Sequence, residues 1–424
     1  MLDIKLFREQ AELVKEALQK RQMETSIVDQ VMAIDTQRRQ LLVEVETLKA
    51  ERNAVSKEIS QSKNPKDRET KISKMREVGD RISALDEKVH RVDKELNKLL
   101  AVIPNIPDAD VPVGKDETQN PVIKTFGEKP IFNFTPLPHW DLGPKLGILN
   151  FEQGVKITGS RFYVLSGAGA RLQRALIAWM LDLHNRQGYL EKYPPFMVKG
   201  ETLFASGQLP KFADNLYKDH EEDLWMVPTA EVPLTGIHMG DILDGSCLPL
   251  RYTAYTACFR REKMSAGRDI RGIKRGHQFD KVEIYTFCKP EDSARELEKM
   301  VADASQTCAE LGLPYRIVQQ CTGDLGFNGK KAFDLEVWAA GCGEWLEVSS
   351  ISNVGDFQAR RANIKFKDSR GKKEFVHTLN GSGLGMPRTL IAVLENNQQK
   401  DGTILIPEVL KPWMGGIDCI APEV

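Results

Sequence analysis

Residues Ala257–Cys288 read ACFRREKMSAGRDIRGIKRGHQFDKVEIYTFC. The apolar run that ends before Arg260 predicts a strand at Tyr255–Phe259, and the strict alternation of Gln278–Phe287 predicts a second, half-buried strand. The segment between the two strands is basic and rich in glycine. This stretch therefore predicts a hairpin with a long basic loop.

The residue types of the hairpin fit the binding of a nucleotide and an amine. Arg260 offers a planar fork for an anionic oxygen at a strand end, and Arg268 and Arg275 could hold the far end of a polyphosphate. Phe279 could stack on a nucleobase, while Glu262 and Glu283 are acceptors for an amine. A solvated hairpin with many charges fits the spacing equally well, so the hairpin alone leaves the function open.

Four segments of the chain carry a resemblance to a known family. FRRE at 259–262 followed by HQFDKVE at 277–283 resembles motif 2 of class II aminoacyl-tRNA synthetases, in the form found in seryl-tRNA synthetases. VPTAE at 227–231, EVSSISN at 347–353 and LNGSGLGMPRT at 379–389 resemble the serine-binding element and the later active-site segments of that family. Because all four occur in the family's order, the chain resembles the bacterial type of seryl-tRNA synthetase.

The resemblance implies a fold, a reaction and partners. The repeated hairpins with flanking helices already favour an α+β class, and the resemblance implies an antiparallel sheet flanked by helices, preceded by a helical arm. It implies activation of L-serine by ATP to seryl-adenylate, then transfer of serine to the 3′ end of tRNA(Ser). tRNA(Sec) is a further candidate substrate, and a homodimer is expected. The chain contains no G-x-x-x-x-G-K-[ST] phosphate loop, so ATP would not be held in that manner.

The resemblance also implies the roles of individual residues. The catalytic residues would be Arg260, Glu262 and Arg388. The L-serine-binding residues would be Thr229, Ala230, Glu231, Glu283 and Ser382. The ATP-binding residues would be Arg260, Arg261, Glu262, Arg275, Gly276, Phe279, Glu347, Val348, Ser349, Ser350 and Arg388. Since carboxylates face a triphosphate only through a hard cation, Glu347 is expected to hold Mg²⁺.

Each of these later motifs also has a purely structural interpretation. Thr229 has the position of a helix cap, and strand carboxylates such as Glu347 are most often solvated. Leu379–Gly383 is expected to be a glycine-rich loop that leads into a helix at Thr389–Asn397. Only the resemblance favours the functional interpretations.

The first hundred residues predict an antiparallel helical hairpin. Apolar residues recur at alternating spacings of three and four residues over 27–59 and again over 75–99, and Pro65 with Asn64 breaks the pattern between them. Each helix of about 33 residues would reach roughly 50 Å. The predicted tRNA-binding residues near the tip are Lys63, Lys66, Arg68, Lys71 and Lys74. A coiled coil used for self-association is the alternative, and the resemblance favours a tRNA-binding arm.

Proline-rich residues 104–112 suggest a linker, so we expect an arm at residues 1–105 and a catalytic domain at 106–424. Ala168–Gln187 predicts an amphipathic helix, and Tyr193–Val198 predicts a strand. This helix and strand resemble motif 1 of class II synthetases, which builds the dimer interface of that family.

Composition limits the other possibilities. The formal net charge of −1 means that any nucleic acid must be bound by a local patch. The seven cysteines form no C-x-x-C pair, which argues against a disulfide framework and a cysteine zinc site and favours a reducing, cytoplasmic setting. No apolar run approaches the length of a membrane span, and residues 1–5 lack a signal-peptide core.

Three other functions are compatible with parts of the sequence. A threonyl- or prolyl-tRNA synthetase is disfavoured by the helical arm and by Thr229-Ala230-Glu231. A synthetase-like ligase that charges a carrier protein would lack the arm. A coiled-coil interaction protein with an inactive enzyme domain is disfavoured because the motif residues Arg260, Glu283 and Arg388 are all present.

Overall fold

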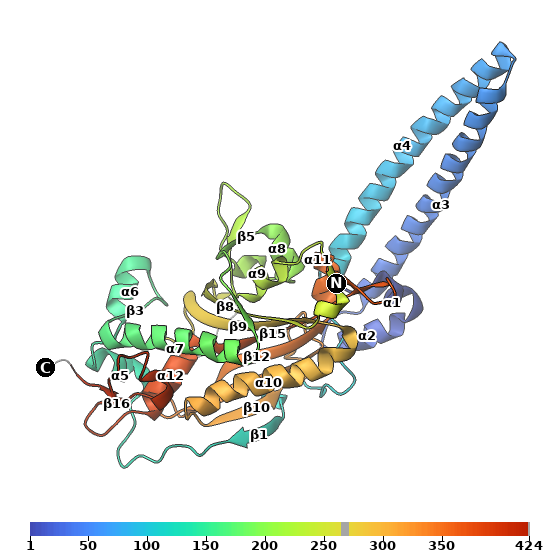
Figure 1. The fold of residues 1–424 in the computed structure, drawn as a ribbon. Helices are drawn as coiled ribbons and strands as arrows, with labels where there is room; N and C mark the ends of the chain where they lie inside the picture. Colours follow the sequence, from blue (N-terminus) through green and yellow to red (C-terminus); the bar gives the residue numbers. More distant parts are fainter. Residues whose placement is uncertain (264–270, 423–424) are drawn as a thin grey trace. The chain divides into compact units, whose positions relative to one another are not determined.

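The computed structural model describes residues 1–263 and 271–422 (Figure 1). The chain forms two compact units, one of Leu2–Pro104 and one of residues 105–424 together with Met1. Among the described residues, no helix combines the length and the apolar character needed to cross a membrane.

The first unit is a helical hairpin. Two short helices, α1 (Ile4–Glu9) and α2 (Ala11–Lys20), precede the long helices α3 (Ser26–Gln61) and α4 (Pro65–Ala101), which run side by side in Figure 1. The 36 residues of α3 span about 54 Å at 1.5 Å per residue. The predicted helical arm is therefore confirmed.

The turn and the seam of this arm follow from the sequence. Asn64 caps α4 by accepting a hydrogen bond from the Lys66 backbone N–H at 3.1 Å, and Pro65 occupies the first turn, where its missing N–H costs nothing. The apolar residues that bury one another between the helices are Val45, Leu48, Val78, Ile82 and Leu85. Arg38, at a polar seam position, pairs with Asp93 of the opposite helix.

The second unit is built on an eight-stranded sheet in the order β1-β10-β11-β12-β15-β9-β8-β4. All neighbouring pairs are antiparallel except β4 with β8. The strands are β1 (Val122–Phe126), β4 (Leu190–Lys192), β8 (Leu250–Phe259), β9 (Gln278–Cys288), β10 (Tyr315–Gln319), β11 (Lys331–Ala339), β12 (Glu344–Gly355) and β15 (His377–Gly385). The predicted α+β class and the predicted hairpin of β8 and β9 are confirmed.

Three helices cover one face of this sheet: α7 (Gly167–Arg186), α10 (Ser293–Glu310) and α12 (Met386–Asn396) (Figure 1). On β9, Val282 and Ile284 point into this helix-covered core, whereas Tyr285 and Phe287 belong to a second apolar cluster. Successive side chains of β9 therefore point to opposite faces of the sheet, as expected for a β-strand.

Shorter elements complete the second unit. The remaining α-helices are α5 (His139–Lys145), α6 (Phe151–Thr158), α8 (Gly200–Ala205), α9 (Glu231–Gly236) and α11 (Phe357–Ala362). The remaining strands are β2 (Leu149–Asn150), β3 (Val164–Leu165), β5 (Met197–Lys199), β6 (Leu224–Met226), β7 (Ile242–Asp244), β13 (Lys365–Lys367), β14 (Lys373–Phe375), β16 (Ile404–Leu405) and β17 (Cys419–Ile420). Single 3-10 turns at Glu117–Gln119, Ala213–Asn215, Gly245–Cys247, Pro290–Asp292 and Glu408–Leu410 join them.

Two local predictions were wrong. Residues 193–198 do not form one strand: β4 ends at Lys192, β5 begins at Met197, and Pro194 and Pro195 between them have no N–H for a ladder. The expected loop at 379–383 is instead part of β15, which pairs with both β12 and β9.

Two glycines of β15 allow neighbouring side chains to pack closely against the strand. A Cβ on Gly381 would lie 2.7 Å from Ile351 Cγ1, and a Cβ on Gly383 would lie 2.2 Å from His184 Nε2. A glycine inside a strand commonly marks such an approach, and here it was misinterpreted as a turn.

Candidate active site

A cavity of about 630 Å³ opens on the sheet face opposite α7, α10 and α12. This volume is in the range of small-molecule sites. The predicted site residues that line it are Thr229, Glu231, Arg260, Glu262, Arg275, Gly276, Phe279, Glu283, Glu347, Val348, Ser349, Ser350, Ser382 and Arg388. Four separate sequence motifs therefore meet in one cavity.

The guanidinium of Arg260 is held in place at the end of β8. The Arg260 backbone N–H donates to the carbonyl oxygen of His277 at 2.9 Å, and its Nε donates to the carbonyl oxygen of Pro228 at 3.2 Å. The guanidinium carbon lies 5.1 Å from the ring centroid of Phe279. The cation and the aromatic ring that we expected to bind phosphate and base are thus neighbours on the same face.

Two further arginines carry charge into the cavity. Arg275 lies 3.5 Å from the carboxylate of Glu262. Arg388, in the first turn of α12, donates to the Glu347 carbonyl oxygen at 2.7 Å and lies 3.4 Å from its carboxylate. These contacts orient both guanidinium groups before any ligand is present.

Lys281 is a site residue that the sequence interpretation missed. Its Nζ lies 2.6 Å from Glu283 Oε2 and donates to Thr229 Oγ1 at 2.7 Å. Because Lys281 is two residues from both Phe279 and Glu283, the alternation of β9 could have revealed it. Ser382 of β15 is the cross-strand partner of Glu283, so a hydroxyl and a carboxylate face the same part of the cavity.

Glu231 forms the floor of this region, at the start of α9. Its carboxylate accepts a hydrogen bond from Gln358, and its backbone N–H donates to Thr229 Oγ1 at 3.2 Å. Burial, together with the negative charge of Glu283, raises the pKa of Glu231 to about 7. Ala230 is the N-cap residue of α9, and the Thr229 hydroxyl accepts from the first N–H of the helix while Thr229 also lines the cavity.

A β-bulge brings Glu347 and Ser350 onto the same face. Ser349 pairs with Leu335 and Glu347 pairs with Glu336, so Val348 is an extra residue on β12 and its side chain enters the core. A second bulge at Gly383 lies between Ser382, which pairs with Glu283, and Leu384, which pairs with Val282, so Ser382 and Leu384 face opposite sides of the sheet. Bulges re-aim side chains in this way next to active sites.

The oxygen atoms around Glu347 fit the expected Mg²⁺. Ser350 and Glu347 line the cavity, and the buried Asp334 lies opposite Ser350 on β11. Gln320 Nε2 donates to Asp334 at 2.9 Å and to Ser350 Oγ at 3.1 Å. Burial and the Glu347 charge hold the pKa of Asp334 well above its ordinary value. Carboxylate and hydroxyl oxygens form a donor set that suits a hard cation.

Two predicted site residues in the described part do not line the cavity. The Ala230 side chain is buried in the apolar cluster with Leu234 and Tyr285. Arg261 turns away: its Nε donates to the Leu216 carbonyl oxygen at 2.9 Å, and its guanidinium carbon lies 4.5 Å from the Tyr217 ring centroid. Arg268, which we expected near the outer phosphates, lies outside the described residues.

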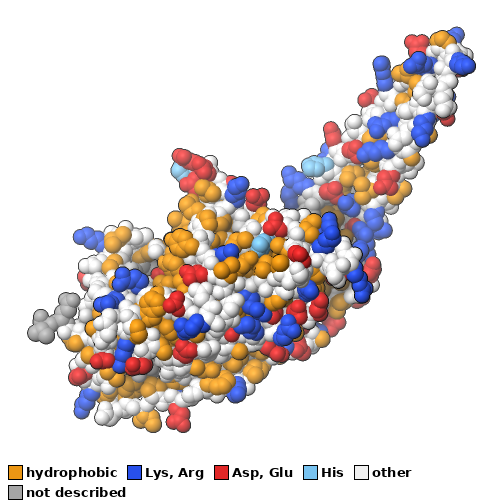
Figure 2. Space-filling model, viewed as in Figure 1, with side chains coloured by type: hydrophobic (Ala, Val, Ile, Leu, Met, Phe, Trp, Pro, Cys, Tyr) orange, Lys and Arg blue, Asp and Glu red, His pale blue; other side chains and the backbone are white. Residues whose placement is uncertain are grey.

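Four of the predicted tRNA-binding residues are exposed near the tip of the arm unit and Lys71 is half-buried, and Figure 2 shows cationic and acidic side chains intermixed there. Lys71 pairs with Glu58 at 2.7 Å and Lys74 with Glu51 at 3.3 Å. The remaining three residues, Lys63, Lys66 and Arg68, surround the turn between α3 and α4.

The fold and the cavity define the class of protein as a class II aminoacyl-tRNA synthetase. Residues 212–397 match the model described as the tRNA synthetase class II core domain (G, H, P, S and T), and residues 1–107 match the seryl-tRNA synthetase N-terminal domain. The chain is 61% identical over 421 residues to a protein named Serine--tRNA ligase from Roseiflexus sp. (strain RS-1), which covers 99% of both chains.

Solved structures agree with this assignment. The seryl-tRNA synthetase from Pyrococcus horikoshii complexed with ATP superposes with a TM-score of 0.93 at 40% identity and covers 100% of both chains. The cytoplasmic serine-tRNA ligase from Naegleria fowleri in complex with AMP has a TM-score of 0.88 at 32% identity, over 100% of this chain and 99% of that one. The chain belongs to the seryl-tRNA synthetase family, which confirms the predicted family and enzyme class.

The raised pKa of Glu231 predicts a pH-dependent stability. Between pH 4.5 and about 7 the folded chain binds a proton that the unfolded chain has released, so stability falls as pH rises across this window and then levels off. The loss is at most about 3 kcal/mol. Glu231→Gln should abolish this loss of stability. The unfolding free energy of the wild type, measured in denaturant, should therefore fall more between pH 5 and pH 8 than that of the variant. Equal pH slopes for the two proteins would contradict the assignment.

Proposed function

We propose that this chain joins L-serine to tRNA(Ser) in two steps, with seryl-adenylate as the intermediate. The observation that carries the proposal is the convergence of Arg260, Glu283 and Arg388 on one cavity. The two solved relatives are complexed with ATP and with AMP, which supports a nucleotide as a ligand of this chain.

In the first step, a carboxylate oxygen of serine attacks the α-phosphorus of ATP, and pyrophosphate leaves. Arg260 is positioned to hold the α-phosphate and the serine carboxylate together, with the adenine stacked on Phe279. Arg275 and Arg388 neutralise the outer phosphates, and Glu262 orients Arg275. No protein nucleophile is required, because alignment and charge stabilisation lower the barrier.

Mg²⁺ at Glu347 and Ser350 would neutralise negative charge on the phosphates of ATP. The chain's own contribution at this position is a rigid strand pair. The cross-strand hydrogen bonds of Gln320 fix Asp334 and Ser350 relative to each other, and Arg388 holds Glu347.

Serine is selected at the other end of the cavity. Thr229, Glu231 and Glu283 offer oxygen acceptors for the substrate ammonium and hydroxyl, and Ser382 adds a hydroxyl from the facing strand. A site that hydrogen-bonds a substrate hydroxyl rejects the analogue lacking it by about 10⁴ or more. We therefore expect strong rejection of alanine.

In the second step, a hydroxyl of the terminal ribose of the tRNA attacks the carbonyl carbon of the adenylate, and AMP leaves. We assign recognition of the tRNA to the arm, with Lys63, Lys66 and Arg68 as the stronger phosphate contacts, because Lys71 and Lys74 are already paired. tRNA(Sec) remains a further candidate substrate.

We also propose a homodimer in which α7 and β4 contribute the interface. β4 is at an edge of the large sheet, and two large side chains there are exposed: Leu190 in β4 at 58% and Tyr193 directly after it at 81%. An exposed apolar patch along a strand edge favours burial against a second copy.

The seven free cysteines are consistent with a reducing, cytoplasmic location.

The reaction is tested by exchange of pyrophosphate into ATP in the presence of each amino acid. Serine should support exchange, and alanine should be weaker by about 10⁴ in kcat/KM because Glu283 and Ser382 would lose their partner. Preference for threonine or proline would assign the chain to a different specificity within class II.

Glu283→Ala should lower serine-dependent exchange by at least about 100-fold, since it removes a charged acceptor from the serine end and leaves the Lys281 ammonium without its carboxylate partner. The matched control is Glu336→Ala, a strand glutamate that pairs with Arg316 outside the cavity and should change exchange little. Near-normal exchange by Glu283→Ala would remove this residue from the serine site.

A chain beginning at Asn105 tests the division of labour between the two units. Serine-dependent exchange should survive within about threefold, because every described residue that lines the cavity belongs to the second unit. Charging of tRNA(Ser) should fall by at least about 100-fold, because the phosphate contacts of the arm are lost. Loss of both activities together would show that the proposed division is wrong.

A further inference from the structure

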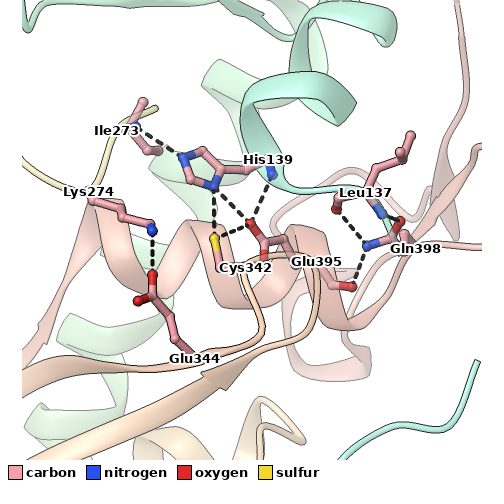
Figure 3. Close-up of polar contacts among 8 residues, drawn as sticks. All are labelled: Leu137, His139, Ile273, Lys274, Cys342, Glu344, Glu395 and Gln398. Atoms are coloured by element: carbon pink, nitrogen blue, oxygen red, sulfur yellow. Dashed lines mark hydrogen bonds and ion pairs between the residues drawn. The ribbon is translucent and has the colours of Figure 1, made fainter. Parts of the chain in front are cut away.

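The loop between β8 and β9 returns to the sheet through a buried anchor at Ile273. The Ile273 side chain is 1% exposed, and its backbone N–H donates to His139 Nε2 at 3.1 Å (Figure 3). His139 is fully buried at the start of α5, 134 residues earlier in the chain. The end of the loop is therefore fixed by a side chain that no sequence motif identified.

The hydrogen bonds fix the tautomer of His139. Nε2 accepts from Ile273 and so carries the lone pair, which leaves the proton on Nδ1, and Nδ1 donates to Glu395 Oε1 at 2.8 Å. The His139 backbone N–H donates to the same oxygen at 2.8 Å. The imidazole is thus a neutral bridge between the loop and Glu395.

Glu395 is buried, and both oxygens of its carboxylate accept hydrogen bonds. Besides the two bonds from His139, it accepts from the Cys342 backbone N–H at 2.8 Å and from Cys342 Sγ at 3.1 Å. Burial alone would raise the pKa of Glu395, but the hydrogen bonds from His139 and Cys342 outweigh it and lower the pKa. The carboxylate is therefore a stable anion that holds the imidazole in one orientation.

His139, Cys342 and Glu395 could also be considered as metal ligands, since their ligand atoms all lie within 4.8 Å of one another. In the structure, however, Nδ1 and Sγ both act as donors to the carboxylate. A metal ion would have to replace these protons and break both hydrogen bonds. Because both groups already donate to Glu395, we interpret the three residues as a network that positions His139. The metal content of the purified protein tests whether they form a metal site instead.

The bridge joins two elements that supply cations to the cavity. Glu395 is in the last turn of α12, whose first turn carries Arg388, and Ile273 is followed directly by Lys274, Arg275 and Gly276 of the cavity lining. Lys274 is itself paired with Glu344 of β12 (Figure 3). The loop at Ile273 is therefore clamped to the C-terminal end of α12, the helix that carries Arg388 in its first turn.

Gly272 allows the close approach on which this clamp depends. Its φ is +68°, and a Cβ at this position would lie 1.9 Å from His139 Nε2. Any other side chain would both strain the backbone and push the loop away from the imidazole.

We propose that His139 is a positioning residue for adenylate formation: it holds Ile273 so that Arg275 and Gly276 face the nucleotide, and Glu395 holds His139. The inference rests on the proposed function. His139 does not line the cavity, so its effect is on how ATP is bound and not on a reacting atom.

A pair of substitutions separates the two bonds of the imidazole. The amide of asparagine takes the place of Nδ1, so His139→Asn keeps a donor to Glu395 and loses the acceptor for Ile273. The longer glutamine side chain reaches the place of Nε2, so His139→Gln keeps the acceptor for Ile273 and loses the donor. In serine-dependent exchange, His139→Asn should raise the KM for ATP about 10-fold, with kcat and the KM for serine within about threefold. His139→Gln keeps the acceptor for Ile273 but loses the bond to Glu395, so its KM for ATP should rise less, by about threefold, with kcat and the KM for serine unchanged.

A merely structural role would lower the melting temperature of both variants and leave the KM for ATP unchanged. Equal values of this KM for wild type and His139→Asn would therefore overturn the inference. One equivalent of a transition metal such as zinc, bound by the purified wild-type protein and lost in His139→Asn, would overturn it as well. Absence of serine-dependent exchange in wild type would instead reject the proposed function.

The loop side of the contact gives an independent test. Gly272→Ala should reproduce the rise in the KM for ATP, and the double variant with His139→Asn should rise no further than the worse single variant, because both break the same contact. The matched control is Gly312→Ala, which has the same φ of +68° and open space around its Cβ, and it should leave the KM for ATP unchanged. Independent, multiplicative effects in the double variant would contradict the shared contact.

Discussion

The alternation of β9 is the constraint on which the rest of the structure depends. Phe279, Lys281 and Glu283 face the cavity, while Val282 and Ile284 lie in the core beneath α7, α10 and α12. A shift of one residue in register would bury the charges and expose the apolar side chains. The pairing of β9 with β8 on one side and β15 on the other therefore fixes both the core and the chemistry.

The neighbouring strands adapt to this register through two bulges. The extra residue at Val348 puts Glu347 on the same face as Ser350. The extra residue at Gly383 turns Leu384 into the core, two residues after Ser382, which faces the cavity beside Glu283. The cavity consequently has a cationic and metal-compatible end for phosphates and a hydroxyl-and-carboxylate end for an amino acid. A regular sheet would not place these groups on one face.

Much of this arrangement could be predicted from local patterns. The heptad-like spacing predicted the arm, and the motifs predicted about half of the residues that line the cavity. Predictions failed where spatial neighbours decide the outcome. The glycines of β15 indicated a loop because their packing against Ile351 and His184 cannot be seen in sequence. The bulges, Asp334 and the bridge of His139 to Ile273 likewise depend on residues distant in the chain.

One rigid face of the sheet aligns a nucleotide with a small hydroxy amino acid. The most direct measurement is a crystal structure with a sulfamoyl analogue of seryl-adenylate. We expect the Arg260 guanidinium to contact the sulfamoyl oxygens, the adenine to lie on Phe279, and the serine hydroxyl to lie within about 3 Å of Glu283 or Ser382. An analogue bound elsewhere, or bound here with its serine side chain directed away from Glu283, would contradict this alignment.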